Sequence, residues 1–203
     1  LLKEVAGVDK AYVVEDDSPY GKGLSAQFQK DMGAGIVGKD AVKTGDTDFS
    51  GVVNSIIDKN PPAVFYSGYY PEAGPFVKQL KAAGFKGVVV TADGVKDPEF
   101  IKLAGKDAAE GTLITCPCVP GENIKAFNDA YQAKFNVAPG TYSAEAYDAM
   151  NIFLAGIESG IDNRADMLAF VNSYDKDGIT KHLKFSDTGE PTEIPVWGYK
   201  VQG

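Results

Sequence analysis

The sequence predicts an α/β protein in which a lobe built on a doubly wound parallel sheet is followed by a partial second lobe of helices and a terminal β-hairpin. Up to about residue 116, short apolar runs alternate five times with helical stretches, and the connections are only a few residues long. After Cys116 this alternation stops and the sequence becomes mostly helical. These two observations predict two domains, an α/β lobe over residues 1–117 and the second lobe over residues 118–203.

The composition is typical of a globular protein that binds neither nucleic acid nor an anionic membrane surface. Of the 203 residues, 44% are hydrophobic and 24% are charged, and the formal net charge is −8. A phosphate-rich partner needs a basic surface, and no apolar run reaches the roughly 20 residues that span a bilayer. The first six residues lack a signal-peptide pattern and are typical of the end of a helix. We therefore expect a larger parent protein whose N-terminal part is missing from this chain.

Five strands are expected in the first lobe, over residues 10–15, 35–42, 63–66, 86–91 and 111–116. The helix after the first strand begins with Ser18 and Pro19, which suit the N-cap and the first helical position. The helix after the third strand begins near Pro71 and ends at Gly84. Strict alternation of strands and helices with short connections predicts a parallel sheet with right-handed crossovers.

The remainder of the chain carries expected helices and a hairpin but no parallel strands of its own. Helices are predicted over residues 123–135, 143–158 and 165–174, where apolar residues recur at helical spacing. Strands over residues 181–185 and 194–201 are joined through a turn at residues 187–189, which predicts the terminal hairpin.

Aromatic and polar side chains gather at the carboxyl ends of the predicted strands, where open α/β sheets bind ligands. The candidates in the turn after the third strand are Ser67, Gly68, Tyr69 and Tyr70. Tyr20 in the first helix, and Asp93 and Gly94 after the fourth strand, are expected at the same edge. Aromatic walls with one carboxylate suit a small ligand that bears an ammonium group. The alternative is that the tyrosines only cover the end of the sheet and that Asp93 is a solvated turn residue.

Other chemistries lack part of the residue set that they need. Asp16 and Asp17 follow the first strand as in a phospho-acceptor receiver domain, but a Ser-Gly-Tyr turn stands where the third aspartate is required. No glycine-rich phosphate motif is present. His182, the single histidine, has no nucleophile elbow to serve and is interpreted as structural. Asp93 and Glu72 could do acid and base work, but no spacing supports it. We expect no cofactor, no metal site and no catalytic residue.

The two cysteines, Cys116 and Cys118, are separated only by Pro117. As half of a metal site they lack the second cluster of cysteine or histidine that would complete four ligands. A pair of thiols at the end of a strand is therefore favoured over a metal site. A disulfide between them stays open in an oxidising compartment, although a one-residue spacer would be strained.

Five segments, in this order and spacing, resemble the branched-chain amino-acid-binding proteins of ABC importers. They are Ser18-Pro19-Tyr20-Gly21-Lys22-Gly23-Leu24, Asp48-Phe49-Ser50, Tyr66-Ser67-Gly68-Tyr69-Tyr70-Pro71-Glu72-Ala73-Gly74, Leu80-Lys81-Ala82-Ala83-Gly84 and Asp93-Gly94-Val95. No single segment suffices, but together they make a specific match that extends over the whole chain.

This resemblance implies a non-enzymatic, two-lobed solute-binding protein of the type I periplasmic-binding fold, which closes on an amino acid in the cleft between its lobes. Tyr20 and Tyr69 match ligand-contacting tyrosines, and Tyr142 aligns with an aromatic residue that lines the side-chain pocket. Asp93 stands where leucine-binding members place a glutamate on the ligand ammonium. Because aspartate is one methylene shorter, it would reach the ligand through water or accept a bulkier one. The expected ligand is a branched-chain or related amino acid.

The resemblance also implies an extracytoplasmic protein, periplasmic or lipid-tethered, that delivers its ligand to the membrane permease of an ABC transporter. The family's first segment, which builds most of the other lobe, is absent, so we expect that segment or a second copy of the chain as a partner. Two alternatives stay open: an α/β enzyme that uses Asp93 as acid or base in the same cleft, and the ligand-sensing domain of a receptor with the same fold.

Overall fold

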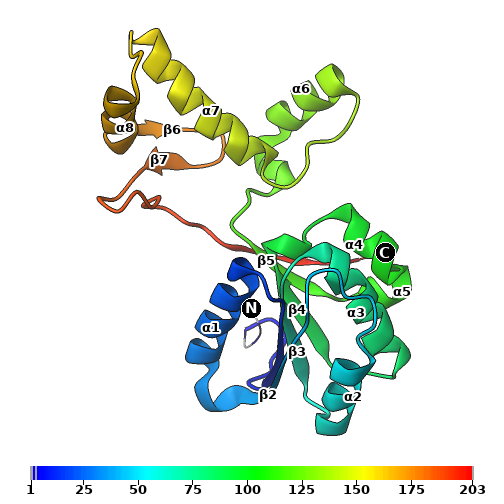
Figure 1. Ribbon diagram of the computed structural model, residues 1–203. Helices are drawn as coiled ribbons and strands as arrows, with labels where there is room; N and C mark the ends of the chain where they lie inside the picture. The colour runs from blue at the N-terminus through cyan, green and yellow to red at the C-terminus, as the bar shows by residue number, and fades with distance from the viewer. Residues whose placement is uncertain (1, 3, 203) are drawn as a thin grey trace. The chain divides into compact units, whose positions relative to one another are not determined.

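The structure is a computed structural model that describes residue 2 and residues 4–202, and it divides into two compact units (Figure 1). Unit 1 comprises the chain up to Cys116 together with the residues from Gly198 on, and unit 2 comprises Pro117–Trp197. The boundary falls one residue before the predicted one, and the residues from Gly198 on join unit 1 rather than the second lobe.

The helix end predicted over residues 1–6 is not found. Residues 2 and 4–6 form turns and a bend, and residues 1 and 3 lie outside the described residues. A run this short cannot fix a helical period, because helix formation requires several consecutive turns to offset its nucleation.

Unit 1 is built on a six-stranded sheet with the strand order β2-β1-β3-β4-β5-β8. The strands are β1 (Ala11–Glu15), β2 (Ile36–Ala41), β3 (Ala63–Ser67), β4 (Val88–Ala92), β5 (Leu113–Cys116) and β8 (Trp197–Lys200). The pairs β1–β2, β1–β3, β3–β4 and β4–β5 are all parallel, which confirms the predicted parallel sheet.

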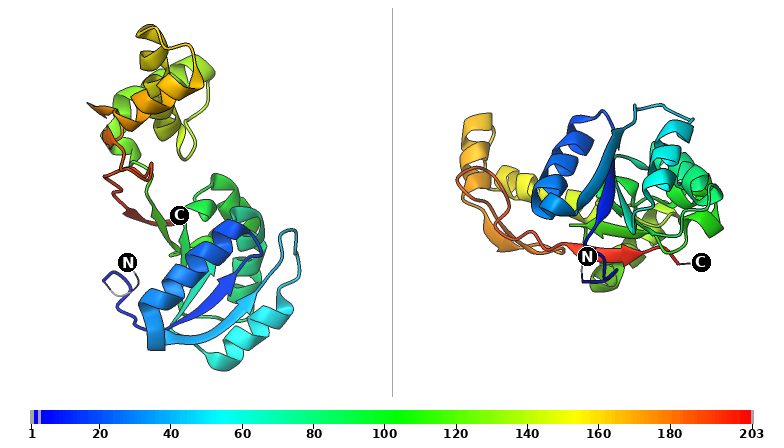
Figure 2. Two further views of the ribbon diagram at one scale, coloured as in Figure 1. Left: turned by 60° about the vertical axis from the view of Figure 1, so that its left-hand side comes forward. Right: turned by 90° about the horizontal axis from the view of Figure 1, so that it is seen from below.

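Helices cover both faces of this sheet, with α1 on one side and α2 to α5 on the other (Figures 1 and 2). They are α1 (Pro19–Met32), α2 (Ser50–Lys59), α3 (Tyr70–Ala82), α4 (Pro98–Ala104) and α5 (Lys106–Ala109), with the short 3₁₀ turns η1 (Gly33–Gly35) and η2 (Asp93–Val95). Alternate residues of a strand point to opposite faces of the sheet, as β3 shows. Ala63 and Phe65 of β3 pack with residues of α1, whereas Val64 and Tyr66 pack with residues of α2, α3 and α4.

The strand order places a topological switch point in unit 1. From β1 the chain first passes to β2 on one side and then to β3 on the other, so the turns that follow β1 and β3 leave adjacent strands in opposite directions. The Asp16 N–H donates to the Ser67 carbonyl oxygen at 2.9 Å, which ties these two turns together. Open α/β sheets bind ligands at such a point, beyond the carboxyl ends of the strands.

Unit 2 consists of three helices and a two-stranded antiparallel sheet. Its elements are η3 (Gly121–Ile124), α6 (Lys125–Phe135), α7 (Ser143–Glu158), α8 (Arg164–Asn172), β6 (Asp175–Asp177) and β7 (His182–Lys184). Two carboxylates of α7 hold other segments of the unit. Glu145 accepts from the Val119 N–H at 2.7 Å, and the buried Asp148 accepts from the Ile179 and Thr180 N–H groups, each at 2.9 Å.

The predicted terminal hairpin is found only next to its turn, where Phe185 and Pro191 form an isolated antiparallel bridge and the Thr192 N–H donates to the Lys184 carbonyl oxygen at 2.9 Å. The two strands predicted for it pair with other strands. The first of its strands, β7, pairs with β6, which the sequence did not predict, and the second, β8, lies beside β5 in the sheet of unit 1. The all-charged sequence of β6, Asp-Lys-Asp, carries no apolar alternation that marks a strand. The partner of β8 is about eighty residues away in the sequence, and no local turn signal reports such a pairing.

Candidate functional site

The turn between β1 and α1 is organised by a buried carboxylate. Asp16 is 1% exposed, and its Oδ1 accepts hydrogen bonds from the Ser18 N–H at 3.1 Å and from the Ser18 hydroxyl at 2.5 Å. The Ser18 Oγ in turn accepts from the Gly21 N–H at 2.9 Å and so caps α1, as predicted for this N-cap. This cap fixes the first turn of α1, in which Tyr20 lies.

Tyr20 connects the first strand–helix turn to the turn after β4. Its hydroxyl donates to the Asp93 Oδ1 at 2.9 Å and accepts from the Gly94 N–H at 3.2 Å. The structure therefore brings together three residues that the sequence analysis placed at one edge, although Asp93 is more than seventy residues from Tyr20 in the chain.

Tyr69 completes this edge from the turn after β3. Its ring centroid lies 5.0 Å from that of Tyr20, with the two planes tilted by 33°. Gly94 lies directly against both rings: a Cβ there would be 3.1 Å from the Tyr20 ring, 3.2 Å from the Tyr69 ring and 2.7 Å from the Gly68 carbonyl oxygen. Only a residue without a side chain fits at position 94, so the three turns meet closely.

The electrostatics of this edge keep the Tyr20 phenol protonated. Burial raises the pKa of Tyr20 well above its usual value, and the neighbouring Asp93 carboxylate raises it further, while the Gly94 N–H opposes the rise. A neutral phenol donates to the carboxylate and presents its ring face. The resulting surface, a carboxylate flanked by two tyrosines of which Tyr69 is 44% exposed, suits a cationic group and an apolar group side by side.

Beneath Tyr69 lies a layer of buried polar groups. Tyr66 and Ser67 are fully buried, and Glu72 is 5% exposed and accepts from the Gly45 N–H at 2.8 Å. Burial raises the pKa of Tyr66, and the Asp16 and Glu72 carboxylates raise it further, so this phenol is also neutral. Its ring stacks on Phe76 with the centroids 5.5 Å apart, which fixes this layer to the core.

The other predicted site residues fall into different places. Ser67 and Gly68 are buried, and Tyr70 packs partly buried against the core cluster, so within this turn Tyr69 presents the most exposed side chain. Tyr142 is the residue before α7 in unit 2, with a left-handed φ of 67°. A role of Tyr142 in the same site stays a prediction.

Asp16 is the residue of this region that the sequence analysis missed, because the pair Asp16–Asp17 was considered only as a metal-binding pair. The spacing held a usable signal. An aspartate two residues before a serine N-cap is typical of a local turn in which the carboxylate accepts backbone N–H groups. The two aspartates bind different segments, since Asp16 accepts from Ser18 whereas Asp17 accepts from the Thr44 N–H at 2.9 Å.

The two cysteines are disulfide-bonded, and neither is a free thiol. The sequence left the redox state of this pair open, and the structure shows the disulfide. Disulfides persist in oxidising compartments such as the periplasm.

Within the described part of the chain, no group of three or more histidine, cysteine, aspartate or glutamate side chains could hold a metal ion. In the same residues, no helix is both long enough and apolar enough to cross a membrane.

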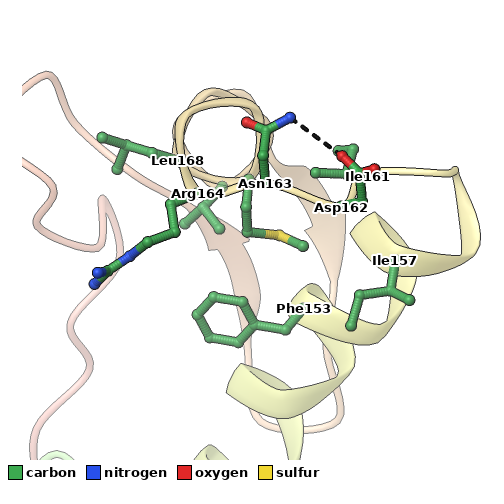
Figure 3. A pocket seen from close by; sticks show the side chains of 9 residues that line it. Phe153, Ile157, Ile161, Asp162, Asn163, Arg164 and Leu168 are labelled. Carbon is green, nitrogen blue, oxygen red and sulfur yellow. Dashed lines mark hydrogen bonds between the residues drawn. The ribbon is translucent and has the colours of Figure 1, made fainter.

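Unit 2 contains a separate, largely apolar pocket of about 690 Å³ between α7 and α8 (Figure 3). Phe153 and Ile157 of α7 face it, and Met167 and Leu168 of α8 line the other side. A rim of polar residues follows the turn at Asp162 and Asn163. None of the predicted ligand residues lines this pocket, so its presence does not bear on the tyrosine and aspartate edge of unit 1.

Comparison with known proteins gives consistent matches. The chain is 31% identical over 196 residues to the Leu/Ile/Val-binding protein BraC3 of Rhizobium johnstonii, which covers 93% of this chain and 53% of the relative. It is 30% identical over 185 residues to the Leu/Ile/Val-binding protein of Escherichia coli K12, with 88% of this chain and 49% of the relative covered. The chain thus spans about half the length of the curated relatives it matches.

Solved structures agree with these matches. The leucine-binding protein LivK of Thermotoga maritima superposes with a TM-score of 0.88 at 27% identity, over 99% of this chain and 59% of that one. The branched-chain amino-acid transporter substrate-binding protein LivJ of Streptococcus pneumoniae, solved in complex with isoleucine, gives a TM-score of 0.84 at 28% identity, over 94% of this chain and 56% of that one. The family model described as periplasmic binding protein matches residues 1–203. The chain therefore belongs to the periplasmic binding protein family.

Proposed function

We propose that this chain is part of the extracytoplasmic solute-binding component of an ABC importer, and that unit 1 supplies one wall of its amino-acid site. The observation that carries the proposal is the edge formed by Tyr20, Tyr69 and Asp93, three residues from three separate turns. The relatives named as Leu/Ile/Val-binding proteins, and the related structure that contains isoleucine, support a branched-chain or related amino acid as the ligand.

The chemistry of this edge matches the two ends of such a ligand. The Asp93 carboxylate can accept a charge-assisted hydrogen bond from the α-ammonium group. The exposed ring of Tyr69 offers an apolar face to an aliphatic side chain and a quadrupole to a cation. Because aspartate reaches less far than glutamate, we propose that the ammonium lies closer to the Tyr20 hydroxyl or is bridged by water.

An extracytoplasmic location and a membrane permease as partner follow from the same proposal. The disulfide supports the location, because cytosolic thiols are kept reduced. The acidic net charge of −8 supports a partner surface that is not itself anionic.

The proposal is tested by titrating leucine, isoleucine and valine into the whole protein that contains this chain, with calorimetry as the readout. Asp93→Ala should weaken binding by about 1.5 to 3 kcal/mol, the usual scale of a hydrogen bond to a charged group. Unchanged affinity in this variant would remove Asp93 from the site.

Asp97→Ala is the matched control, because it removes a carboxylate from the same segment. Asp97 accepts from the Glu99 N–H at 2.8 Å and caps α4, so its loss should leave the ligand affinity unchanged. Consumption of the ligand during the titration would favour an enzyme and contradict the proposal.

A further inference from the structure

The Asp16 carboxylate is linked by hydrogen bonds to the turn that carries Tyr20. Its Oδ1 accepts both the N–H and the hydroxyl hydrogen of Ser18, and the Ser18 Oγ accepts from the Gly21 N–H. Tyr20 lies between these two anchored residues. The direction in which its side chain leaves α1 is therefore set by Asp16 through Ser18.

The same carboxylate lies against the turn that carries Tyr69. A Cβ at Gly68 would be 2.7 Å from the Asp16 Oδ2 and 2.7 Å from the Tyr66 hydroxyl, so a side chain at position 68 would have to displace one of these groups. A Cβ at Gly21 would meet the Asp16 Oδ1 in the same way. The Asp16 side chain thus fills the space between the first turn of α1 and the residue before Tyr69.

The surroundings of Asp16 are buried and closely packed. Asp16, Tyr66 and Ser67 are almost completely buried, and the Asp16 backbone N–H donates to the Ser67 carbonyl oxygen. The Tyr66 ring stacks on Phe76 in the core. A displacement of the Asp16 carboxylate would therefore move the turns that carry Tyr20 and Tyr69, because the core on its other side is already filled.

From these contacts we infer that Asp16 is a positioning residue for the ligand site: it fixes the spacing of the Tyr20 and Tyr69 rings without touching the ligand. The expected effect of Asp16 on ligand affinity rests on the proposed function. The expected effect of Asp16 on the spacing of the Tyr20 and Tyr69 rings does not depend on any ligand. A carboxylate that only caps a turn would hold Ser18 but would not affect Tyr69.

The experiment combines one ligand-independent and one ligand-dependent readout on the whole protein. The nuclear Overhauser effect between the Tyr20 and Tyr69 rings, whose centroids are 5.0 Å apart, reports their spacing. Calorimetry with isoleucine reports the affinity. Asp16→Ala should lose the ring-to-ring effect and weaken binding about tenfold or more, because the charged hydrogen-bond acceptor of the Ser18 N–H and hydroxyl is removed.

Two further variants separate positioning from general damage. Asp16→Asn should keep the ring-to-ring effect and an affinity within about threefold of the wild type, because its amide oxygen can still accept from Ser18. Asp17→Ala, the adjacent carboxylate that holds Thr44, should change neither readout. Equal losses in Asp17→Ala, or a lost ring-to-ring effect in Asp16→Asn, would overturn the inference.

If Asp16→Ala does not fold, Gly68→Ala gives the decisive measurement from the other side of the contact. The added methyl group would press on the Asp16 Oδ2 and should displace Tyr69, so the ring-to-ring effect should weaken. Unchanged ring spacing in a folded Gly68→Ala or Asp16→Ala variant would overturn the inference. A wild-type protein that shows the ring-to-ring effect but binds none of the three amino acids would refute the proposed function alone.

Discussion

The helices α3 of unit 1 and α7 of unit 2 carry similar apolar stripes but differ in what covers them. In α3, Phe76, Val77 and Leu80 are all fully buried against the sheet. In α7, Met150 and Ile157 are each 58% exposed and Phe153 is 45% exposed, and the latter two line the open pocket beside α8 (Figure 3). An apolar stripe in the sequence shows that a helix has a face to bury, but it does not identify the element that buries it.

The two units also differ in the interactions that stabilise each of them internally. Unit 1 has two hydrophobic clusters on the two faces of one sheet. Among the described residues of unit 2, the sheet is the charged hairpin β6–β7, and few apolar side chains are fully buried. Its segments are connected instead by carboxylates of α7 that accept backbone N–H groups. Unit 1 therefore depends on packing, and unit 2 depends more on specific polar contacts.

The largest expected effect tests the packing side of this comparison. Phe76→Ala should cost about 3 to 5 kcal/mol of unfolding free energy in unit 1, because it opens a cavity between Phe49 and Tyr66. Phe153→Ala in α7, half exposed, should cost about 1 kcal/mol or less. Amide hydrogen exchange in α3 and α7 separates the two units. A similar cost for both variants would show that the stripe of α7 is covered in solution.

A smaller effect is expected from the polar contacts of unit 2. Asp148→Ala leaves the N–H groups of Ile179 and Thr180 without their acceptor, and should cost about 2 to 3 kcal/mol. Exchange of these two amides should accelerate while α3 is unaffected. Asp129→Ala, which breaks only the exposed pair with Lys125, is the control and should have little effect. Unchanged exchange at residues 179 and 180 would contradict the comparison.

The smallest effect is a pH dependence confined to the hairpin of unit 2. Hydrogen bonds to Asp177 and then Asp175 raise the pKa of His182 above 6.5. Because the folded pKa is raised, this contribution to stability is complete below pH 6.5 and is lost as the pH rises through the folded pKa. Hydrogen bonds from Lys184 and then His182 lower the pKa of Asp175 below 3.8, so its contribution is present above pH 3.8 and is lost as the pH falls further.

The hairpin should therefore be most resistant to opening between about pH 3.8 and 6.5. Proton NMR titration of the His182 ring, the single histidine of the chain, measures the shift directly. Asp177→Asn should bring the titration back toward 6.5. A wild-type midpoint at or below 6.5 would show that the two carboxylates do not hold the ring in solution.

The fold of unit 1 was predictable because the sequence signals for each of its strands and helices lie within or next to that element. Each strand is followed by its helix within a few residues, and caps such as Ser18 and Asp97 mark where helices begin. The hairpin prediction holds at its turn but is wrong for the strands, which pair with other strands. The strand β8 pairs across a long sequence separation, and β6 is stabilised by charges that resemble those of an ordinary exposed loop.

The candidate site was predictable to the same degree. The rule that carboxyl ends of parallel strands share an edge brought Tyr20 and Asp93 together, as the structure confirms. It could not separate Tyr69 from Tyr70, since one residue of helical rotation decides which ring faces the core. Nor could it identify Asp16, whose importance depends on its contact with Gly68, a residue from another turn.

The place of β8 in the sheet has a consequence for how the protein is made. The ribosome produces β1 to β5, then the whole of unit 2, and only afterwards the strand that lies beside β5. Until that strand emerges, the hydrogen-bonding groups on one margin of β5 have no strand to pair with. Nascent chains should therefore be most vulnerable to intermolecular strand pairing during this interval. A truncation that removes β8 would leave this margin of β5 unpaired permanently.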